Sequence, residues 1–305
     1  MPPPINIMTL TKLKVSLKKL LPPGFIDHLE RVWSFMGRPL MASLTQRRLR
    51  GFQGITIKAV TFRGQSFKLL LNPANGFLDT YIFSVGIYED YILDLIHNNI
   101  PRGGVFFDVG ANIGLHSVFA AKCLQGSTGR VYAFEPVPSL REQLQASLAL
   151  NNLSNVKVFP YALGDSNASS EIYFSNCNMG HSTLMPSSDV NQVLRVEIKK
   201  LDCEFESLDR LDLMKIDVEG YEYSVLVGAG KTIQKYRPVI LLEFSPSTYE
   251  VFDTNLPGLI LDFLMPLYLV YDVDDGMKLL LDKQQYLSNF SSRNRNQTNF
   301  FCTPR

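Results

Sequence analysis

Four acidic side chains each end a short apolar run of the kind that forms a buried strand: Asp108, Glu135, Asp217 and Glu243. If these strands are parallel, their carboxyl ends meet at one edge of a sheet, where open α/β proteins bind ligands. Carboxylates gathered there repel one another unless a ligand, a metal or a basic partner offsets their charge. The pattern therefore predicts a ligand site at that edge.

The first acidic residue, Asp108, leads into a turn that contains Gly110 and Gly114 and then into a helix-compatible segment. The two glycines remove Cβ atoms where a backbone must approach a ligand closely. The turn is not the G-x-G-x-x-G that seats a pyrophosphate, because Ala111 and Asn112 stand where a middle glycine is expected. An acidic residue beside the turn would also repel phosphate. The turn therefore favours a ligand with a cationic end, such as the amino acid part of S-adenosylmethionine (SAM).

Glu135 follows this turn at about the 20-residue spacing typical of an acidic residue that binds ribose. Its two oxygens can accept hydrogen bonds from both ribose hydroxyls. Dinucleotide-binding proteins use the same device, so Glu135 predicts an adenosine ligand without choosing between NAD and SAM. Ala162, just beyond the third strand, is a candidate contact for the adenine ring. Asp165 could accept from the adenine amino group or be an ordinary turn residue.

A second acidic motif, KIDVEGYE, places Asp217 at a strand end and Glu219 two residues later. Such a pair could bind a substrate hydroxyl, act as general base, or hold a divalent metal. Glu219 could instead complement the dipole of the following helix. His181 lies in an inserted segment and could reach substrate or be a surface histidine. Glu89, ahead of the core sheet, is a further candidate, with a solvent-facing helical position as the alternative.

From residue 104 onward the chain alternates strands and helices, which predicts an α/β fold with a doubly wound, mostly parallel sheet. The expected parallel strands are residues 105–108, 130–134, 156–159, 213–216 and 239–242. The expected helices are residues 115–124, 139–151 and 256–265. An inserted strand pair (171–175 and 193–199) and an antiparallel closing hairpin (268–273 and 277–281) complete the core, and we expect residues 288–299 to form a loop.

The N-terminal part predicts a hairpin over residues 54–71 and a helical segment over 79–98 with a break at Gly86. Residues 1–50 differ in composition and are expected to form a helical accessory segment, with residues 51–305 as one domain. Over residues 9–21 the leucines fall on one face of a predicted helix and the lysines lie elsewhere on it. Such a basic amphipathic helix can lie on an anionic membrane, although packing on the domain is the commoner role.

Taken together, the motifs FDVGANIG, the pair Glu135-Pro136, ALGD, KIDVEGYE, LVGAG and ILLEF resemble the FkbM-type methyltransferase family over about residues 86–250. The resemblance implies a Rossmann-like methyltransferase fold, SAM as cofactor and O-methylation of a small molecule or sugar. The residues expected to contact the cofactor are Glu89, Asp108, Gly110, Asn112, Gly114, Glu135, Pro136, Ala162 and Asp217. The residues expected to act in catalysis are Asp217, Glu219 and His181. The role of His116 stays open, and no metal ligands are assigned.

Composition fits a globular protein, with 46% hydrophobic and 19% charged residues. The net charge of +1 gives no reason to expect nucleic acid as a partner. The cysteines are scattered without metal-site spacing, which favours a reducing, cytoplasmic location: Cys123, Cys177, Cys203 and Cys302. We expect a small-molecule or glycan hydroxyl as acceptor. The alternatives are a dinucleotide-dependent oxidoreductase and a non-catalytic SAM-binding protein.

Overall fold

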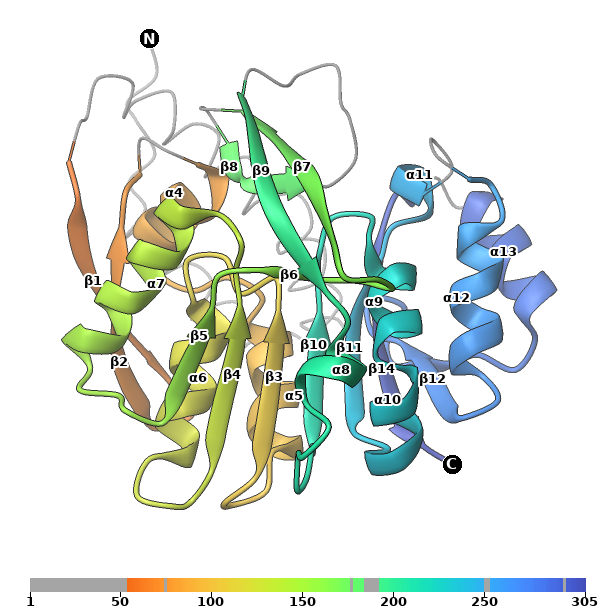
Figure 1. The fold of residues 1–305 in the computed structure, drawn as a ribbon, viewed down its shortest axis with the longest axis horizontal. Coiled ribbons are helices and arrows are strands. Elements are labelled where there is room, and N and C mark those ends of the chain that lie inside the picture. Colours follow the sequence, from red (N-terminus) through yellow and green to blue (C-terminus); the bar gives the residue numbers. More distant parts are fainter. Residues whose placement is uncertain (1–53, 74–75, 176–177, 184–191, 250–252, 293–294) are drawn as a thin grey trace, which may run out of the picture.

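The computed structural model describes residues 54–73, 76–175, 178–183, 192–249, 253–292 and 295–305 (Figure 1). The expected N-terminal helical segment, residues 1–50, lies outside the described residues, as does the helix proposed to contact a membrane, residues 9–21. The domain boundary near residue 50 therefore stays a prediction. Within the described part, every helix is too short or too polar to cross a membrane.

The centre of the fold is an eight-stranded sheet with the order β13-β12-β14-β11-β10-β3-β4-β5. Five strands pair in parallel: β3 (Val105–Val109), β4 (Arg130–Phe134), β5 (Val156–Phe159), β10 (Leu213–Ile216) and β11 (Val239–Phe244). Along the chain, β4 and β5 follow β3 on one side of the sheet, and β10 and β11 are then added on the other side of β3. Strand order thus reverses between β3 and β10, and a ligand crevice is expected at such a point. The predicted doubly wound fold is confirmed.

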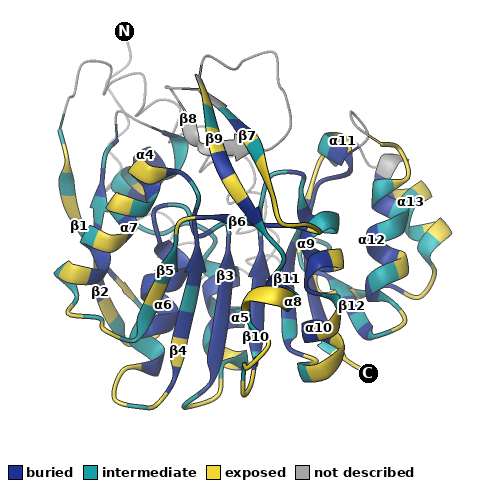
Figure 2. Ribbon diagram, viewed as in Figure 1, coloured by how far each residue is buried: buried dark blue, intermediate teal, exposed yellow. Residues whose placement is uncertain are grey.

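Side chains alternate between the two faces of this sheet, as the period of a strand requires. Phe106 packs into one buried cluster with helices α5 (Asp90–Asn99), α6 (Leu115–Leu124) and α7 (Pro138–Leu150). Phe107 packs into the other, with α9 (Glu222–Gly228), α10 (Gly230–Tyr236) and α12 (Leu256–Leu264). The central parallel strands β3, β10 and β11 are consequently buried along almost their whole length, whereas the edge strand β5 has no fully buried residue (Figure 2). This burial on both faces explains their nearly continuous apolar sequences.

The C-terminal edge of the sheet is antiparallel and differs in part from the sequence prediction. Its strands are β12 (Tyr268–Asp272), β13 (Lys278–Leu279) and β14 (Thr298–Pro304). The closing hairpin β12–β13 is confirmed, but the loop expected over residues 288–299 is wrong. Helix α13 (Lys283–Ser292) and the start of β14 occupy this stretch, and β14 inserts between β11 and β12.

The remaining elements are an N-terminal hairpin that packs on α6 and α7, a second sheet and several short helices. The predicted hairpin is confirmed as β1 (Thr56–Phe62) and β2 (Gln65–Leu71), followed by α4 (Phe77–Val85) and the expected break at Gly86. The inserted strands are β7 (Ala168–Ser175) and β9 (Gln192–Lys199), to which β6 (Ala162–Leu163) and β8 (Asn178–Thr183) add to make a four-stranded sheet. This second sheet stands over the strand ends in Figure 1. Two short helices, α8 (Leu201–Glu204) and α11 (Pro246–Tyr249), complete the described elements.

Candidate functional site

A cavity opens at the carboxyl ends of β3, β4, β10 and β11, at the point where the strand order reverses. Most of the residues expected from the sequence line it: Glu89, Gly110, Asn112, Glu135, Pro136, Ala162, Asp217 and Glu219. Ile172 of β7 also lines it, so the inserted sheet forms part of the wall. The site predicted from strand ends is thus gathered in one place by the fold.

Both glycines of the first turn adopt positive φ, 84° at Gly110 and 90° at Gly114, and both are packed against protein. A Cβ on Gly110 would lie 1.9 Å from the carbonyl oxygen of Asp217. A Cβ on Gly114 would lie 2.2 Å from the side chain of Leu144 on α7, and Gly114 does not line the cavity. The packing of the turn, rather than the approach of a ligand alone, therefore requires these glycines.

Glu135 joins the first turn to the end of β4. Its Oε2 accepts from the backbone N–H of Asn112 and its Oε1 from that of Val137, each at 2.8 Å. Burial raises the pKa of Glu135 to about 7, although these hydrogen bonds lower it. Each carboxylate oxygen has a second lone pair that can still accept from a ligand hydroxyl. The position is compatible with the expected ribose contact.

Asp108 differs from the expectation because it does not line the cavity. Its side chain is fully buried, its Oδ2 accepts from the hydroxyl of Ser117 at 2.6 Å, and its Oδ1 has no hydrogen-bond partner. Burial raises the pKa of Asp108, and the charge of Lys215, its neighbour in register on β10, lowers it. Asp108 therefore acts on the site through Lys215, its charged neighbour on β10.

Lys215 is a buried basic residue that interacts with the carboxylates of Asp217, Asp108 and Glu89, and no sequence motif indicated a role for it. Its side chain is 4% exposed, and its Nζ lies 2.5 Å from Oδ2 of Asp217. Burial alone would lower the pKa of Lys215, but the carboxylates of Asp217, Asp108 and Glu89 raise it. A lysine in the otherwise apolar run Leu213–Ile216 is the sequence signal that could have identified it.

The carboxyl ends of β10 and β11 carry the acidic wall of the cavity, Asp217, Glu219 and Glu243. Carboxylate oxygens of the three lie within 4.8 Å of one another, a spacing at which one cation could contact all of them. Glu219 adopts φ of 53°. Burial raises the pKa of Glu243 well above its ordinary value, and the negative charges of Asp217 and Glu219 raise it further. Both the loss of solvent around the carboxyl and the repulsion from its neighbours disfavour its charged form.

Glu222, rather than Glu219, accepts the backbone hydrogen bonds of the second acidic turn. Its carboxylate is buried and accepts from the N–H groups of Val218 and Gly220 at 3.0–3.2 Å. Burial raises the pKa of Glu222 to about 7. Glu219 of the same turn lines the cavity.

Glu89 and His116 form a second polar face of the cavity. Glu89 precedes α5 at φ of 48°, and its side chain is 12% exposed, so the solvent-facing alternative is wrong. Burial raises the pKa of Glu89 to about 8, and Lys215 lowers it. His116 Nε2 lies 3.4 Å from Oε2 of Glu89 without hydrogen-bond geometry. Burial and Lys215 hold the pKa of His116 well below its usual range, so its imidazole is neutral near pH 7.

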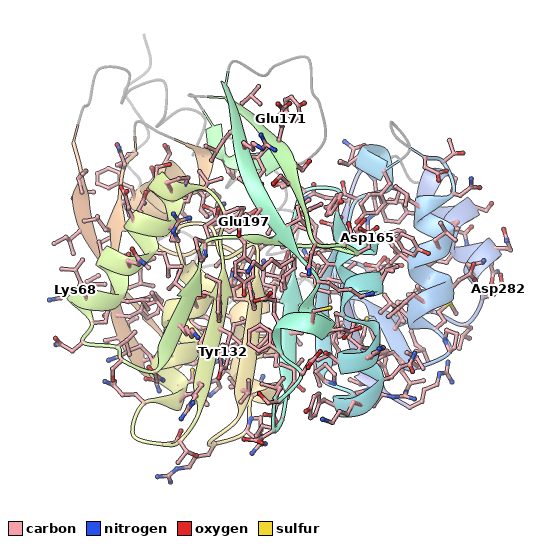
Figure 3. The ribbon with its side chains drawn as sticks, viewed as in Figure 1. Lys68, Tyr132, Asp165, Glu171, Glu197 and Asp282 are labelled. Atoms are coloured by element: carbon pink, nitrogen blue, oxygen red, sulfur yellow. The ribbon has the colours of Figure 1, made fainter. Side chains whose placement is uncertain are left out.

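Two other sequence candidates lie apart from the cavity or outside the described side chains. Asp165 is exposed on the loop before β7, bonded to Ser166, and does not line the cavity (Figure 3). The expected contact with the adenine amino group stays a prediction that the cavity lining does not support. His181 lies in β8, and its side chain is outside the described residues, so its catalytic role stays a prediction.

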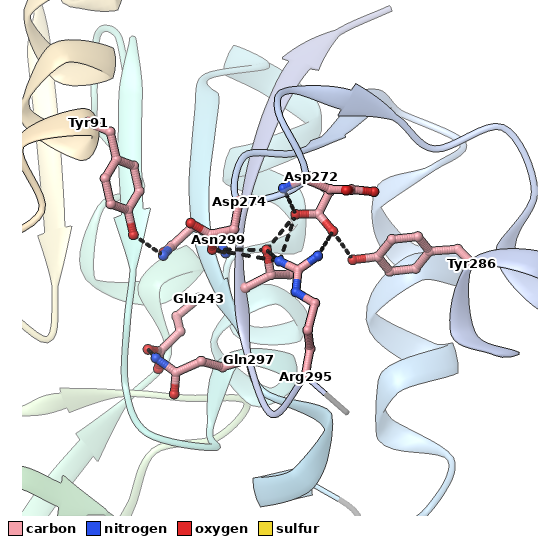
Figure 4. A network of polar contacts seen from close by, with 10 residues as sticks. Tyr91, Glu243, Asp272, Asp274, Tyr286, Arg295, Gln297 and Asn299 are labelled. Carbon is pink, nitrogen blue, oxygen red and sulfur yellow. Dashed lines mark hydrogen bonds and ion pairs between the residues drawn. The ribbon is translucent and has the colours of Figure 1, made fainter. Parts of the chain in front are cut away.

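The segment just before the C-terminal strand β14 supplies a residue that the sequence motifs did not indicate. Gln297 lines the cavity, and its amide nitrogen donates to Oε1 of Glu243 at 3.3 Å (Figure 4). The segment is anchored by Arg295, which makes two hydrogen bonds to the fully buried Asp272 at 3.0 and 3.2 Å. Asn299 donates to the hydroxyl of Tyr91 on α5. No local pattern in the sequence predicts that the tail returns to the site.

The strand order, the switch-point cavity and its acidic rim define a Rossmann-like methyltransferase fold. The family model described as the methyltransferase FkbM domain matches residues 108–279, more than half of the chain. The protein therefore belongs to the FkbM methyltransferase family and is a methyltransferase, as the motifs predicted.

Individual relatives are similar over about half of the chain. The methyltransferase sdnD of Sordaria araneosa is 30% identical over 53% of this chain and 73% of its own length. The 2-O-methyltransferase NoeI of Sinorhizobium fredii is 26% identical over 57% and 76%, respectively. The hexuronic acid methyltransferase AglP of Haloferax volcanii is 26% identical over 50%, and this chain spans 61% of it. The crystal structure of an FkbM methyltransferase from Methylobacillus flagellatus aligns with 17% identity and a TM-score of 0.41, over 74% of this chain and 53% of that one.

Proposed function

We propose that this protein is a SAM-dependent O-methyltransferase that methylates a hydroxyl of a small molecule or sugar. The observation that carries the proposal is the two-sided cavity. One side combines the Gly110 turn, Asn112, Glu135 and Ala162, and the other is the acidic wall that contains Glu219. The relative named for 2-O-methylation supports transfer to oxygen, and the relative named for hexuronic acid methylation supports a sugar acceptor.

The donor set of the first side fits an adenosyl cofactor with a cationic amino acid end. Glu135 retains lone pairs for two ribose hydroxyls, and Ala162 offers a backbone and a small apolar surface beside them. The described lining residues include carboxylates and one lysine, and that lysine, Lys215, is already paired with Asp217. A pyrophosphate would lack a basic partner here, which argues against a dinucleotide.

The reaction needs an acceptor oxygen held in line and relieved of its proton. SAM supplies, when bound, a methyl group on a sulfonium, so one O–C bond forms as one S–C bond breaks. Asp217 is held by Lys215, and we assign it to orienting the acceptor and cofactor. Glu219 and Glu243 line the same space, and we assign acceptance of the hydroxyl proton to this pair. Correct positioning of the reacting oxygen accounts for much of the expected rate.

Calorimetric titration with S-adenosylhomocysteine (SAH) tests the cofactor assignment, with NAD titrated in parallel. We expect SAH to bind and NAD not to bind. Glu135→Gln should weaken SAH binding at least about tenfold, or about 1.4 kcal/mol, because the amide accepts less strongly and has only one oxygen. Glu142→Gln, an exposed position on α7, is the matched control. Binding of NAD but not SAH by the folded protein would refute the proposal.

A further inference from the structure

We propose that Glu89 binds the ammonium group at the amino acid end of the cofactor. Binding then releases the carboxyl proton of Glu89 to solvent, so that cofactor affinity depends on pH. The inference rests on the proposed function and adds this proton linkage to it. It starts from a carboxyl group that lines the cavity, is 12% exposed and lacks a hydrogen-bond donor among the described residues.

The backbone around Glu89 is held in place while its side chain is left available. Glu89 is the N-cap residue of α5, in the left-handed region at φ of 48°, and its side chain makes no capping hydrogen bond. Its backbone carbonyl accepts from the N–H groups of Ile92 and Leu93. Left-handed backbone is strained for a residue with a side chain, and such strain gathers at functional sites. The local structure therefore fixes the residue without using its carboxyl group.

The two nitrogen-bearing side chains nearby do not compensate Glu89. Nε2 of His116 lies 3.4 Å from Oε2 of Glu89 without hydrogen-bond geometry, and burial and Lys215 keep this imidazole neutral near pH 7. The Nζ of Lys215 is paired with Asp217 at 2.5 Å. Buried carboxyl groups are ordinarily hydrogen-bonded or paired with a cation. A ligand ammonium would supply both, since it carries a charge and three N–H donors.

Glu89 also lies where the amino acid end of the cofactor is expected. Glu135, the proposed ribose contact, accepts from the N–H of Asn112 in the first turn. His116 is the second residue of α6, directly after that turn, and its ring contacts Glu89. Asp108, the acid that the sequence suggested for the cationic end, does not line the cavity. Glu89 is therefore the carboxyl group that can meet this end of the ligand.

The protonation of Glu89 gives this contact a measurable consequence. Burial raises its pKa to about 8, Lys215 lowers it, and Asp217, Asp274 and Glu219 raise it further. The other titratable groups that act with Glu89 are His116, Tyr88, Tyr91 and Glu243. Without ligand, Glu89 is thus mostly protonated at pH 7. A bound ammonium favours the charged form, so the carboxyl group loses its proton as the ligand binds.

The size of the effect follows from the fraction of Glu89 that is ionised before binding. A carboxyl group with a pKa of about 8 is about 1% ionised at pH 6, about 10% at pH 7 and about half ionised at pH 8. Because the ionised form binds the ammonium better, affinity should rise with pH over this range.

Calorimetric titration with SAH at pH 7, in phosphate and in Tris, measures the protons released on binding, because the two buffers differ in ionisation enthalpy. 5′-Methylthioadenosine, which keeps the adenosine and the sulfur but lacks the amino acid end, is titrated in parallel. We expect SAH to release about 0.9 proton more than methylthioadenosine. From pH 6 to pH 8, the affinity for SAH relative to methylthioadenosine should rise at least about tenfold. Equal proton release by the two ligands would overturn the inference.

Glu89→Gln gives an independent test, because the amide keeps the size of the side chain and cannot ionise. At pH 8, we expect this variant to bind SAH at least about tenfold more weakly, to bind methylthioadenosine as the unsubstituted protein does, and to lose the additional proton release. Glu142→Gln, at an exposed position of α7, is the matched control and should change none of these values. A Glu89→Gln variant that weakens both ligands equally would contradict the assignment, since it would show a structural role. The comparison of the two ligands on the unsubstituted protein tests the inference even where this variant does not fold.

The same titrations distinguish failure of the inference from failure of the proposed function. Binding of SAH without additional proton release overturns the role of Glu89 and leaves the cofactor assignment intact. Absent SAH binding by the folded protein overturns the proposed function itself.

Discussion

Replacing Lys215 by methionine should destabilise the protein far more than the loss of one surface charge. Lys215 lies in β10, opposite Asp108 in register, and forms a 2.5 Å ion pair with Asp217. The carboxylates of Asp217, Asp108 and Glu89 all favour its charged form. Methionine has a similar volume and is apolar, so the variant removes the cation while keeping the packing.

The magnitude follows from the burial of the two partners. Removing one partner of a buried ion pair costs about 3–5 kcal/mol, because the other charge is left uncompensated. Water reaches part of Asp217, whose side chain is 27% exposed, so we expect the lower end, about 3 kcal/mol. At about 2 °C per kcal/mol for a domain of this size, the midpoint of thermal unfolding should fall by about 6 °C.

Denaturant unfolding followed by circular dichroism measures this change. Lys231→Met is the matched control, because the same substitution at an exposed residue of α10 should change stability by less than about 0.5 kcal/mol. The double variant Lys215→Met/Asp217→Asn should recover part of the loss, since the exposed member of the pair is then neutral. A loss in Lys215→Met no larger than in the control would refute the assignment of Lys215 as the compensating charge of the site.

Three further predictions concern the turn, the buried acids and the C-terminal anchor. Gly110→Ala should abolish SAH binding and reduce stability, because the added Cβ would lie 1.9 Å from the carbonyl oxygen of Asp217. The control Gly230→Ala has open space around it and should leave the midpoint of thermal unfolding unchanged or slightly raised. Glu89 has a folded pKa of about 8 against 4.5, so the folded state holds the proton more tightly and stability should fall as pH rises through that interval. Glu89→Gln should flatten this slope in unfolding measured at pH 5 and pH 8; an unchanged slope would contradict the assignment. In Arg295→Lys, the lysine cannot make both hydrogen bonds to Asp272, so the free energy of unfolding should fall by about 2 kcal/mol. Methyl transfer should be reduced and the affinity for SAH retained.

The sequence predicted the parallel core well because these strands are buried on both faces and their composition shows it. The apolar runs Val105–Phe107 and Ile240–Leu242 lead directly into acidic residues, Asp108 and Glu243, that mark the edge of the sheet. The tail was predicted less well. Thr298 and Asn299 read as loop residues, yet both are buried in β14 because Asp272 and Asp274 supply hydrogen bonds from elsewhere in the chain. These hydrogen bonds join residues far apart in the sequence, so a local sequence pattern does not predict them.

The site shows the same limit at the level of single residues. Motifs identified Glu135 and Asp217 as cavity residues because both follow strands of one sheet. The motifs did not show that Glu222 accepts the backbone hydrogen bonds of the second turn, or that Lys215 pairs with Asp217. Both contacts depend on the three-dimensional path of the backbone. Gln297 reaches the cavity only because β14 inserts beside β11.

A crystal structure of the protein with SAH tests the central claim most directly. We predict that the ribose hydroxyls contact Glu135, that the adenine lies by Ala162, and that the sulfur faces the space bounded by Asp217, Glu219 and Glu243. SAH bound elsewhere, or with its sulfur turned away from the acidic wall, would contradict the account.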